Sequence, residues 1–287
     1  MENKAGLKTV VHSVYDIQKL RIQMGNRIVM NFKAKLGQKP SMPEEEMDAE
    51  GKKILADLRR HYRKITDGIK AFPSQKKFVG DELITSYTEL CLLSQYLDLE
   101  SYEQQHFRRL ESVLVDFPIW TEWMKGVKGC GPAMAGVLIS EIDIHKARYA
   151  SSLFKYAGLD VAGDGRGRSR KAEHLVKVQY TNTKGEQVER NSITFNPFLK
   201  TKVVGVLGPS FLRSGSEYAK FYYDYKHRLE NHEKYKDVTK LHRHNMAIRY
   251  MVKRFLVALY VQWRTLEKLP VAPEYHEAIL GHVHRAA

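Results

Sequence analysis

The chain has 287 residues, enough for one large domain or two modest ones, and a net charge of +14. Its two cysteines are too few for a disulfide framework or a thiolate metal site, which predicts a reducing, cytoplasmic setting. The sequence has neither a long apolar run nor a signal-peptide pattern, so we expect no membrane contact. The charge is uneven, because residues 1–120 carry +2 and residues 121–287 carry +12. Nucleic acid is therefore the expected partner of the second part.

The first part of the chain has the pattern of long amphipathic helices. Apolar residues at intervals of three and four predict a helix over residues 7–32, and after a break at residues 37–46 the same spacing continues to about residue 72. A third helix is expected over residues 81–115. We interpret residues 1–118 as a helical hairpin or coiled-coil arm. Its apolar stripes fit a homodimer contact or the core of a monomeric bundle, and we expect a homodimer.

The second part, residues 119–287, is richer in glycine, aromatic and basic residues, and its predicted elements are shorter. Runs rich in β-formers at residues 175–180 and 187–195 flank Asn182-Thr183-Lys184-Gly185 and predict a β-hairpin insertion. The helices expected around this insertion cover residues 136–142, 151–157, 197–212, 217–230 and 245–266. The expected fold class is therefore mainly α, a helical arm followed by a basic helical module with one small β-hairpin.

Residues 126–135 have the pattern of a helix-hairpin-helix, in which a glycine turn joins two short helices. Gly129 and Gly131 would form the turn and let it approach a phosphate, where free N–H groups of the second helix face the anion. Lys128 would add a positive charge, and Pro132 suits the first turn of the second helix. The alternatives are a tight interhelical turn without a ligand and, less favoured because no strand pattern precedes it, a dinucleotide-binding loop.

A glycine-rich basic loop follows, and its cations are Arg166, Arg168, Arg170 and Lys171. Arginine binds phosphates in a bidentate manner and stacks on unpaired bases, while glycines keep the backbone mobile and accessible. The loop is therefore predicted to bind nucleic acid. The alternative is a solvated surface loop without a ligand.

Further candidate nucleic-acid contacts lie later in the chain, at Lys200, Lys202, His242, Arg243 and His244. The spacing of the two histidines places them on different sides of a helix, and no cysteine or carboxylate cluster accompanies them. We therefore interpret them as phosphate contacts or surface residues rather than metal ligands. No metal and no cofactor are expected.

Several of these pieces together resemble a known family. From about residue 123 to residue 263 the chain is similar to the C-terminal domain of insertion-sequence transposases guided by a bridge RNA, whose members share a Gly-x-Gly-Pro-x-x-Ala hairpin. That domain is similar in layout to the Nop domain of guide-RNA-binding proteins, including those of tandem interspaced guide RNA systems, in which a coiled coil precedes a compact RNA-binding module. The resemblance implies a small guide RNA and DNA as partners. The matching pieces are Gly129-x-Gly131-Pro132-x-x-Ala135, Ala157-Gly158-Leu159, Asn196-Pro197-x-Leu199-Lys200, Phe221-Tyr222 and the basic helix of residues 249–259.

The chain departs from the family in two places. Family transposases begin with an RNase-H-like nuclease half, whereas residues 1–120 have a helical pattern, so no nuclease domain is expected. The family's nucleophilic serine follows the Gly-Leu motif, where this chain has Asp164-Gly165-Arg166. Ser169 is the nearest hydroxyl, and the arginines beside it would stabilise developing charge. Ser210, Ser214 and Ser216 are further candidates.

The sequence therefore predicts a guide-RNA-binding, RNA-guided DNA-targeting protein without a nuclease domain, in which binding rather than catalysis is the expected activity. One alternative is a transposase or serine-dependent DNA recombinase of the bridge-RNA family, with Ser169 as the catalytic residue. Another is a DNA-binding protein that uses the hairpin on duplex phosphates, tolerates any sequence and never contacts RNA.

Overall fold

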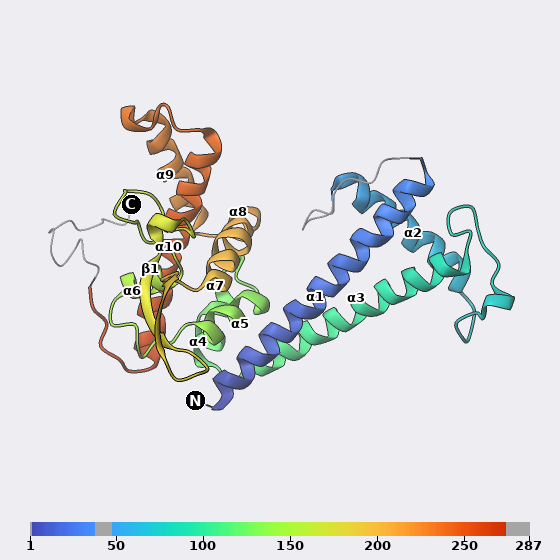
Figure 1. The fold of residues 1–287 in the computed structure, drawn as a ribbon, viewed down its shortest axis with the longest axis horizontal. Helices are drawn as coiled ribbons and strands as arrows, with labels where there is room; N and C mark the ends of the chain where they lie inside the picture. The colour runs from blue at the N-terminus through green and yellow to red at the C-terminus, as the bar shows by residue number, and fades with distance from the viewer. Residues whose placement is uncertain (1, 38–47, 274–287) are drawn as a thin grey trace. The chain divides into compact units, whose positions relative to one another are not determined.

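The computed structural model describes residues 2–37 and 48–273, and these residues form a mainly helical fold with one antiparallel β-hairpin (Figure 1). The mainly α fold class predicted from the sequence is confirmed. Packing divides the chain into a unit of residues Thr9–Arg109 and a unit of Met1–Lys8 with Leu110–Ala287, whereas the prediction placed the division near Pro118. Apart from Gly37, the predicted break at residues 37–46 lies outside the described residues. Within the described part of the chain, no helix is long and apolar enough to cross a membrane.

Among its described residues, the unit of residues Thr9–Arg109 has three α-helices that share one core. Ion pairs join Arg21 to Glu103 and Lys35 to Glu89, so α1 (Glu2–Lys35) and α3 (Tyr87–Leu114) run antiparallel (Figure 1). The third helix, α2 (Ala49–Thr66), packs against both. This core includes Ile28, Leu58, Leu90 and Leu93, for which the three-and-four spacing predicted a buried face, together with Phe32, Leu55 and Tyr96. Leu20 and Ile69 share that spacing but are exposed.

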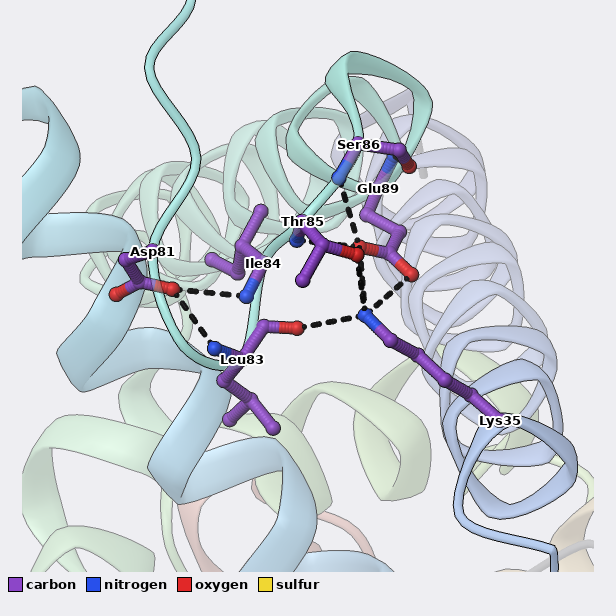
Figure 2. Close-up of polar contacts among 7 residues, drawn as sticks. All are labelled: Lys35, Asp81, Leu83, Ile84, Thr85, Ser86 and Glu89. Carbon is purple, nitrogen blue, oxygen red and sulfur yellow. Dashed lines mark hydrogen bonds and ion pairs between the residues drawn. The ribbon is translucent and has the colours of Figure 1, made fainter.

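The segment between α2 and α3 differs from the sequence prediction at both ends. α2 ends at Thr66 rather than near residue 72, because Asp67 is extended and Gly68 has a φ of +75°. α3 begins at Tyr87 rather than at residue 81, because carboxylates hold the preceding backbone in a capping turn (Figure 2). Asp81 Oδ1 accepts hydrogen bonds from the backbone N–H groups of Leu83 and Ile84, at 3.0 and 2.8 Å.

Glu89 caps the start of α3 from inside the helix. Its Oε2 accepts hydrogen bonds from the backbone N–H groups of Thr85 and Ser86, at 2.8 and 3.1 Å. Lys35 Nζ lies 2.9 and 3.1 Å from the two Glu89 oxygens and also donates to the Leu83 carbonyl at 2.9 Å (Figure 2). Burial opposes ionisation, yet the bonds from Lys35 and from the two N–H groups lower the pKa of Glu89 below its ordinary value. A charged network therefore fixes the end of this unit.

The second unit is organised around α10 (Lys240–Leu266). Packed against α10 are α4 (Pro118–Glu122), α6 (Ala150–Tyr156), α8 (Gly208–Ser214) and α9 (Ala219–Asn231). α5 (Pro132–Glu141) is almost wholly buried and contacts α7 (Pro197–Lys202). α10 begins before the predicted residue 245, because the Thr239 side chain caps it by accepting from the His242 backbone N–H at 3.2 Å.

The predicted helix over residues 197–212 is present but interrupted. A π-helical turn, Val203–Leu207, separates α7 from α8. Asn196 caps α7, since its Oδ1 accepts from the backbone N–H of Leu199 at 3.0 Å, and its Nδ2 donates to buried Glu141 at 2.6 Å. The Asn-Pro pair of the family resemblance therefore has a structural role in this chain.

The predicted β-hairpin is confirmed. β1 (Val176–Thr181) pairs antiparallel with β2 (Gln187–Ser192), in a register that sets Tyr180 opposite Val188. In the turn, Asn182 Oδ1 accepts from the Lys184 backbone N–H at 2.9 Å, and Gly185 has a φ of +83°. Every residue of β1 is exposed, so the hairpin adds little to the core.

Candidate nucleic-acid interface

The basic loop predicted from the sequence is a hydrogen-bonded turn. The Arg168 backbone N–H donates to the Asp160 carbonyl at 3.0 Å, and Val161 pairs with Gly167 in an isolated antiparallel bridge. The Arg168 guanidinium also donates two hydrogen bonds to Asp160 Oδ2, at 2.9 and 3.0 Å. The loop of residues 160–168 therefore has a defined shape, and one of its predicted phosphate-binding arginines pairs with a carboxylate of its own loop.

Two glycines let basic side chains from distant helices approach this loop. The Gly158 carbonyl accepts a hydrogen bond from Arg249 of α10 at 2.9 Å, and a β-carbon at Gly167 would lie 2.5 Å from the Arg249 guanidinium. Gly158 has a φ of +63°, and a β-carbon there would lie 2.7 Å from the Phe195 ring and 3.1 Å from Lys200. Lys200 of α7 donates to a carbonyl of the loop. Only glycine at both positions permits these contacts without rearrangement.

Four cations interact with the Asp160 carboxylate, and Arg170 acts on one of them, Lys200. We call all five the basic cluster: Arg168, Arg170, Lys200, Arg249 and Lys253. Burial, followed by repulsion from Arg249 and Arg170, lowers the pKa of Lys200 to about 8 despite the attraction of Asp160. Burial lowers the pKa of Arg249, and burial with repulsion from Arg249 lowers that of Lys253. An added anion would stabilise the charged forms of these buried cations, so the basic cluster has the chemistry of a phosphate site.

Ser169 follows the loop and contacts a histidine that the sequence patterns did not single out. Ser169 Oγ lies 2.8 Å from His174 Nδ1, and His174 Nε2 lies 3.2 Å from Asp164 Oδ2. The His174 side chain is buried. The hydrogen bond from the Arg166 N–H, and then that from His174, lower the pKa of Asp164, which favours its ionised form. A hydroxyl, an imidazole and a carboxylate in this order can activate a serine as a nucleophile.

The hydrogen bonds of His174 indicate which ring nitrogen carries the proton. The Ser169 backbone N–H donates to Nδ1 at 2.9 Å, so Nδ1 is an acceptor and Nε2 carries the proton that it donates to Asp164. Nδ1 can accept the Ser169 hydroxyl proton as a general base, and this protonation releases the hydrogen bond from the Ser169 N–H. The same tautomer opposes metal binding by Asp164, Glu173 and His174, whose ligand atoms lie within 4.8 Å of one another. Ligation through Nε2 would require the proton to move to Nδ1 and would break the bond from the Ser169 N–H.

The later serine candidates pack the hairpin turn of residues 127–131 against α8. Ser210 Oγ donates to the Gly129 carbonyl at 2.9 Å, and Ser214 Oγ donates to a carbonyl of its own helix at 3.3 Å. Gly129 has a φ of +88°, and a β-carbon there would lie 2.7 Å from Ser214 Oγ. Ser216 is buried. Gly129 therefore packs against α8, and both its left-handed backbone and this packing require glycine.

The other side of the hairpin turn is open. Lys128 and Gly131 are exposed, and a β-carbon at Gly131 would meet nothing within 4 Å. Gly131 immediately precedes α5, and the N-terminus of a helix carries a partial positive charge. Phosphate contact by Lys128 and Gly131 stays a prediction.

Some of the remaining candidates make contacts within the protein. Arg243 donates to backbone carbonyls of residues 235 and 238, at 3.0 and 2.5 Å, and so closes the loop between α9 and α10. His244 Nδ1 lies 2.6 Å from the Tyr222 hydroxyl. Burial lowers the pKa of Lys202 to about 8, and its Nζ lies 5.5 Å from the centre of the Phe198 ring.

The other exposed candidates are Arg166, Arg170, Lys171 and His242. Lys171 Nζ lies 3.6 Å from Glu173, an exposed pair that contributes little to stability. These side chains can therefore turn toward a ligand at small cost.

No family model matches this chain, and the comparisons found no match to it among curated proteins or solved structures. The resemblance to the bridge-RNA transposase domain therefore rests on the sequence motifs alone, and the function proposed for the site rests on those motifs and on its geometry.

The sequence patterns did not single out Arg249, Lys253 or His174 as individual site residues. The spacing of Arg249 and Lys253, four residues apart on α10, puts both on one helix face and was an available signal. No sequence signal identified His174 as the partner of Ser169. The turn of residues 160–168 ends just before Ser169, and it is this folded turn that brings Ser169 close to His174.

Proposed function

We propose that this protein is a guide-RNA-binding, RNA-guided DNA-targeting protein without a nuclease domain, and that its second unit holds the phosphodiester backbone at the basic cluster. The convergence of Lys200, Arg249 and Arg170 on one loop is the observation that carries the proposal. The guide RNA comes from the resemblance to Nop-like and bridge-RNA proteins. Dimerisation through the helical unit stays a prediction, which sedimentation of the purified protein would test.

The buried, mutually close cations of the basic cluster are energetically unfavourable in the free protein, and this is the physical argument for a phosphate ligand. Half-buried cations lose hydration and repel one another, and phosphate oxygens relieve both effects. The Arg168 guanidinium is already oriented by Asp160, so little freedom is lost when a ligand binds beside it. Residues 121–287 carry a net charge of +12, which favours a polyanion over a small anion.

The first experiment identifies the nucleic acid that purifies with the protein. The full chain is expressed with its native flanking DNA, washed at high salt, and the retained nucleic acid is sequenced. A discrete small RNA of uniform length supports the proposal. Recovery of mixed DNA alone contradicts the guided function and favours a sequence-tolerant DNA-binding protein. Recovery of no nucleic acid also contradicts the guided function.

A matched pair of charge variants tests the basic cluster. Arg170→Gln with Lys253→Gln is expected to weaken binding at least tenfold and to reduce the slope of log K against log salt by roughly 0.7 to 0.9 for each phosphate that the variant no longer neutralises. Lys19→Gln with Lys64→Gln removes the same charge from exposed positions of the other unit and should change both quantities little. Equal effects from the two variants would remove the basic cluster from the interface.

A second candidate function, that of a transposase or serine-dependent DNA recombinase, is favoured by the contacts of Ser169, His174 and Asp164. In that reaction His174 Nδ1 takes the Ser169 hydroxyl proton while Oγ attacks the phosphorus of a phosphodiester. The bond from phosphorus to one deoxyribose oxygen breaks, and that oxygen leaves as a hydroxyl with the proton from His174. The basic cluster stabilises the charge on the phosphoryl oxygens. Attack by the hydroxyl of another strand then reverses these steps, joins the strands and restores Ser169.

A covalent protein–DNA adduct is the diagnostic product of this second candidate. Wild-type protein is incubated with DNA, denatured and examined for a species of increased mass. Ser169→Ala should abolish the adduct, and His174→Gln should slow its formation by about 10²- to 10⁴-fold. Ser151→Ala changes an exposed serine of α6 and serves as the control. Absence of an adduct with wild-type protein contradicts this candidate and leaves the binding proposal intact.

The hairpin turn is tested separately, because the sequence-tolerant DNA-binding alternative depends on it. Gly131→Val with Lys128→Glu changes the open side of the turn and should weaken binding to duplex DNA. Gly129→Val is unsuitable for this purpose, since Gly129 packs against α8. Unchanged affinity in the double variant would exclude the turn from the interface.

A further inference from the structure

The β-hairpin of β1 and β2 is an exposed ribbon next to the basic cluster. In the part of the chain that the structure describes, the two strands pair only with each other, and every β1 residue is exposed. A two-stranded hairpin is at best marginally stable in water by itself and gains little from its own packing. Its side chains are therefore available to a ligand.

The strand register defines a polar face. Its cross-strand pairs are Lys177 with Asn191, Gln179 with Glu189, and Thr181 with Gln187. Contacts across this face agree with the register, since Gln187 Nε2 donates to Thr181 Oγ1 at 2.8 Å and Lys177 Nζ lies 2.8 Å from Glu189.

The opposite face of the ribbon is more apolar. It carries Val176, Val178, Tyr180 and Val188, with the Arg190 guanidinium 4.6 Å from the centre of the Tyr180 ring. The two faces therefore differ in chemistry, and the polar face consists entirely of side chains that donate or accept hydrogen bonds.

We infer that the polar face of the ribbon enters the major groove of a DNA duplex and reads base edges there. This inference rests on the proposed nucleic-acid-binding function and adds a ligand surface to it. The major groove admits a two-stranded β-ribbon, and each side-chain type on this face has a partner there. Glutamine and asparagine pair with adenine, lysine pairs with guanine, glutamate accepts from the amino group of cytosine, and the threonine methyl contacts that of thymine.

Short segments join the ends of the ribbon to residues that lie beside the basic cluster. β1 follows His174 closely in sequence, and β2 leads to Phe195, whose ring centre lies 4.5 Å from Lys200 Nζ. Phosphates held by the basic cluster would fix the register of the duplex against the ribbon. Six residues of extended strand span about 20 Å, so one face covers only a few base pairs. An RNA duplex is a poorer ligand, because its major groove is too deep and narrow for side chains to read.

The test is selection of bound duplexes from a random DNA library with the purified full chain. Wild type should enrich a short motif, with about a tenfold loss of affinity when a preferred base pair is changed. The variant Gln179→Ala with Glu189→Ala and Asn191→Ala should lose this motif and retain affinity for random duplex within about twofold. The control variant Gln104→Ala with Gln262→Ala changes exposed positions outside the ribbon and should retain the motif. Circular dichroism confirms that each variant is folded.

The outcomes separate this inference from the proposed function. Binding to DNA without any enriched motif, or the same motif in wild type and the ribbon variant, overturns the ribbon inference and leaves nucleic-acid binding standing. A motif enriched equally in an RNA duplex also overturns it. Failure to bind DNA and RNA alike overturns the proposed function itself.

Discussion

Raising the pH from 7 to 9 is predicted to weaken nucleic-acid binding about tenfold through Lys200 alone. The basic cluster lowers the pKa of Lys200 to about 8 in the free protein, chiefly by burial and then by repulsion from Arg249. A phosphate beside Nζ restores that pKa toward the ordinary value of 10.5. At pH 9 roughly one tenth of the free protein has Lys200 protonated, so binding takes up about one proton and affinity falls about tenfold per pH unit. Near pH 7 Lys200 is protonated in both the free and the bound protein, so the affinity does not change with pH there.

Fluorescence anisotropy with a labelled oligonucleotide at constant ionic strength, between pH 6.5 and 9.5, measures this effect. Lys200→Arg keeps the positive charge across the range and should remove most of the pH dependence. Lys128→Arg makes the same change at an exposed position and should leave it unaltered. Lys202→Arg then tests the second lysine whose pKa is lowered to about 8, and a change there would show that Lys202 also meets the ligand.

An affinity that stays constant from pH 7 to 9, or an equal decline in wild type and Lys200→Arg, would refute the basic cluster as the phosphate site. Folding stability gives an independent check of the depressed pKa. Between pH 8 and 10.5 the unfolded chain binds more protons at Lys200 than the folded chain does, so the free energy of unfolding should rise with pH over this window.

Three further predictions concern the fold. Gly158→Ala forces a side chain into a left-handed backbone beside Phe195 and should lower the free energy of unfolding by about 1–3 kcal/mol, whereas Gly163→Ala, in open space, should change it little in the same urea titration. Glu89→Ala removes the cap of α3 and leaves Lys35 without this partner, and it should lower the free energy of unfolding by about 1–3 kcal/mol in thermal unfolding. An equal loss from Glu82→Ala, at an exposed position, would contradict that role. The pKa values of Glu89 and Asp81 are lowered in the folded chain, so their stabilisation is present above their ordinary pKa and lost as pH falls through the lowered values. Unfolding free energies that match at pH 7 and pH 3 would exclude this contribution.

The sequence by itself determined the elements of the fold that depend on local chemistry. The three-and-four spacing of apolar residues predicted α1 and most of α2 and α3, because a helix exposes or buries a residue according to its position in the period. The run Asn182-Thr183-Lys184-Gly185 predicted the β-hairpin, because its side-chain cap and its positive-φ glycine are properties of a few adjacent residues. Where capping side chains compete with the helix, as Asp81 does before α3, periodicity alone placed the boundary wrongly.

Only the tertiary structure decided which of the many cations form a site. Arg170 was a candidate from its loop and Lys200 from its place in a motif, but their meeting with Arg249 depends on how α7 and α10 pack around Gly158 and Gly167. The sequence predicted nucleic-acid binding for Arg243 as well, yet its side chain closes a loop within the protein. Charge is visible in a sequence, whereas the desolvation and repulsion that give a charge its chemistry depend on neighbours that only the folded chain brings together.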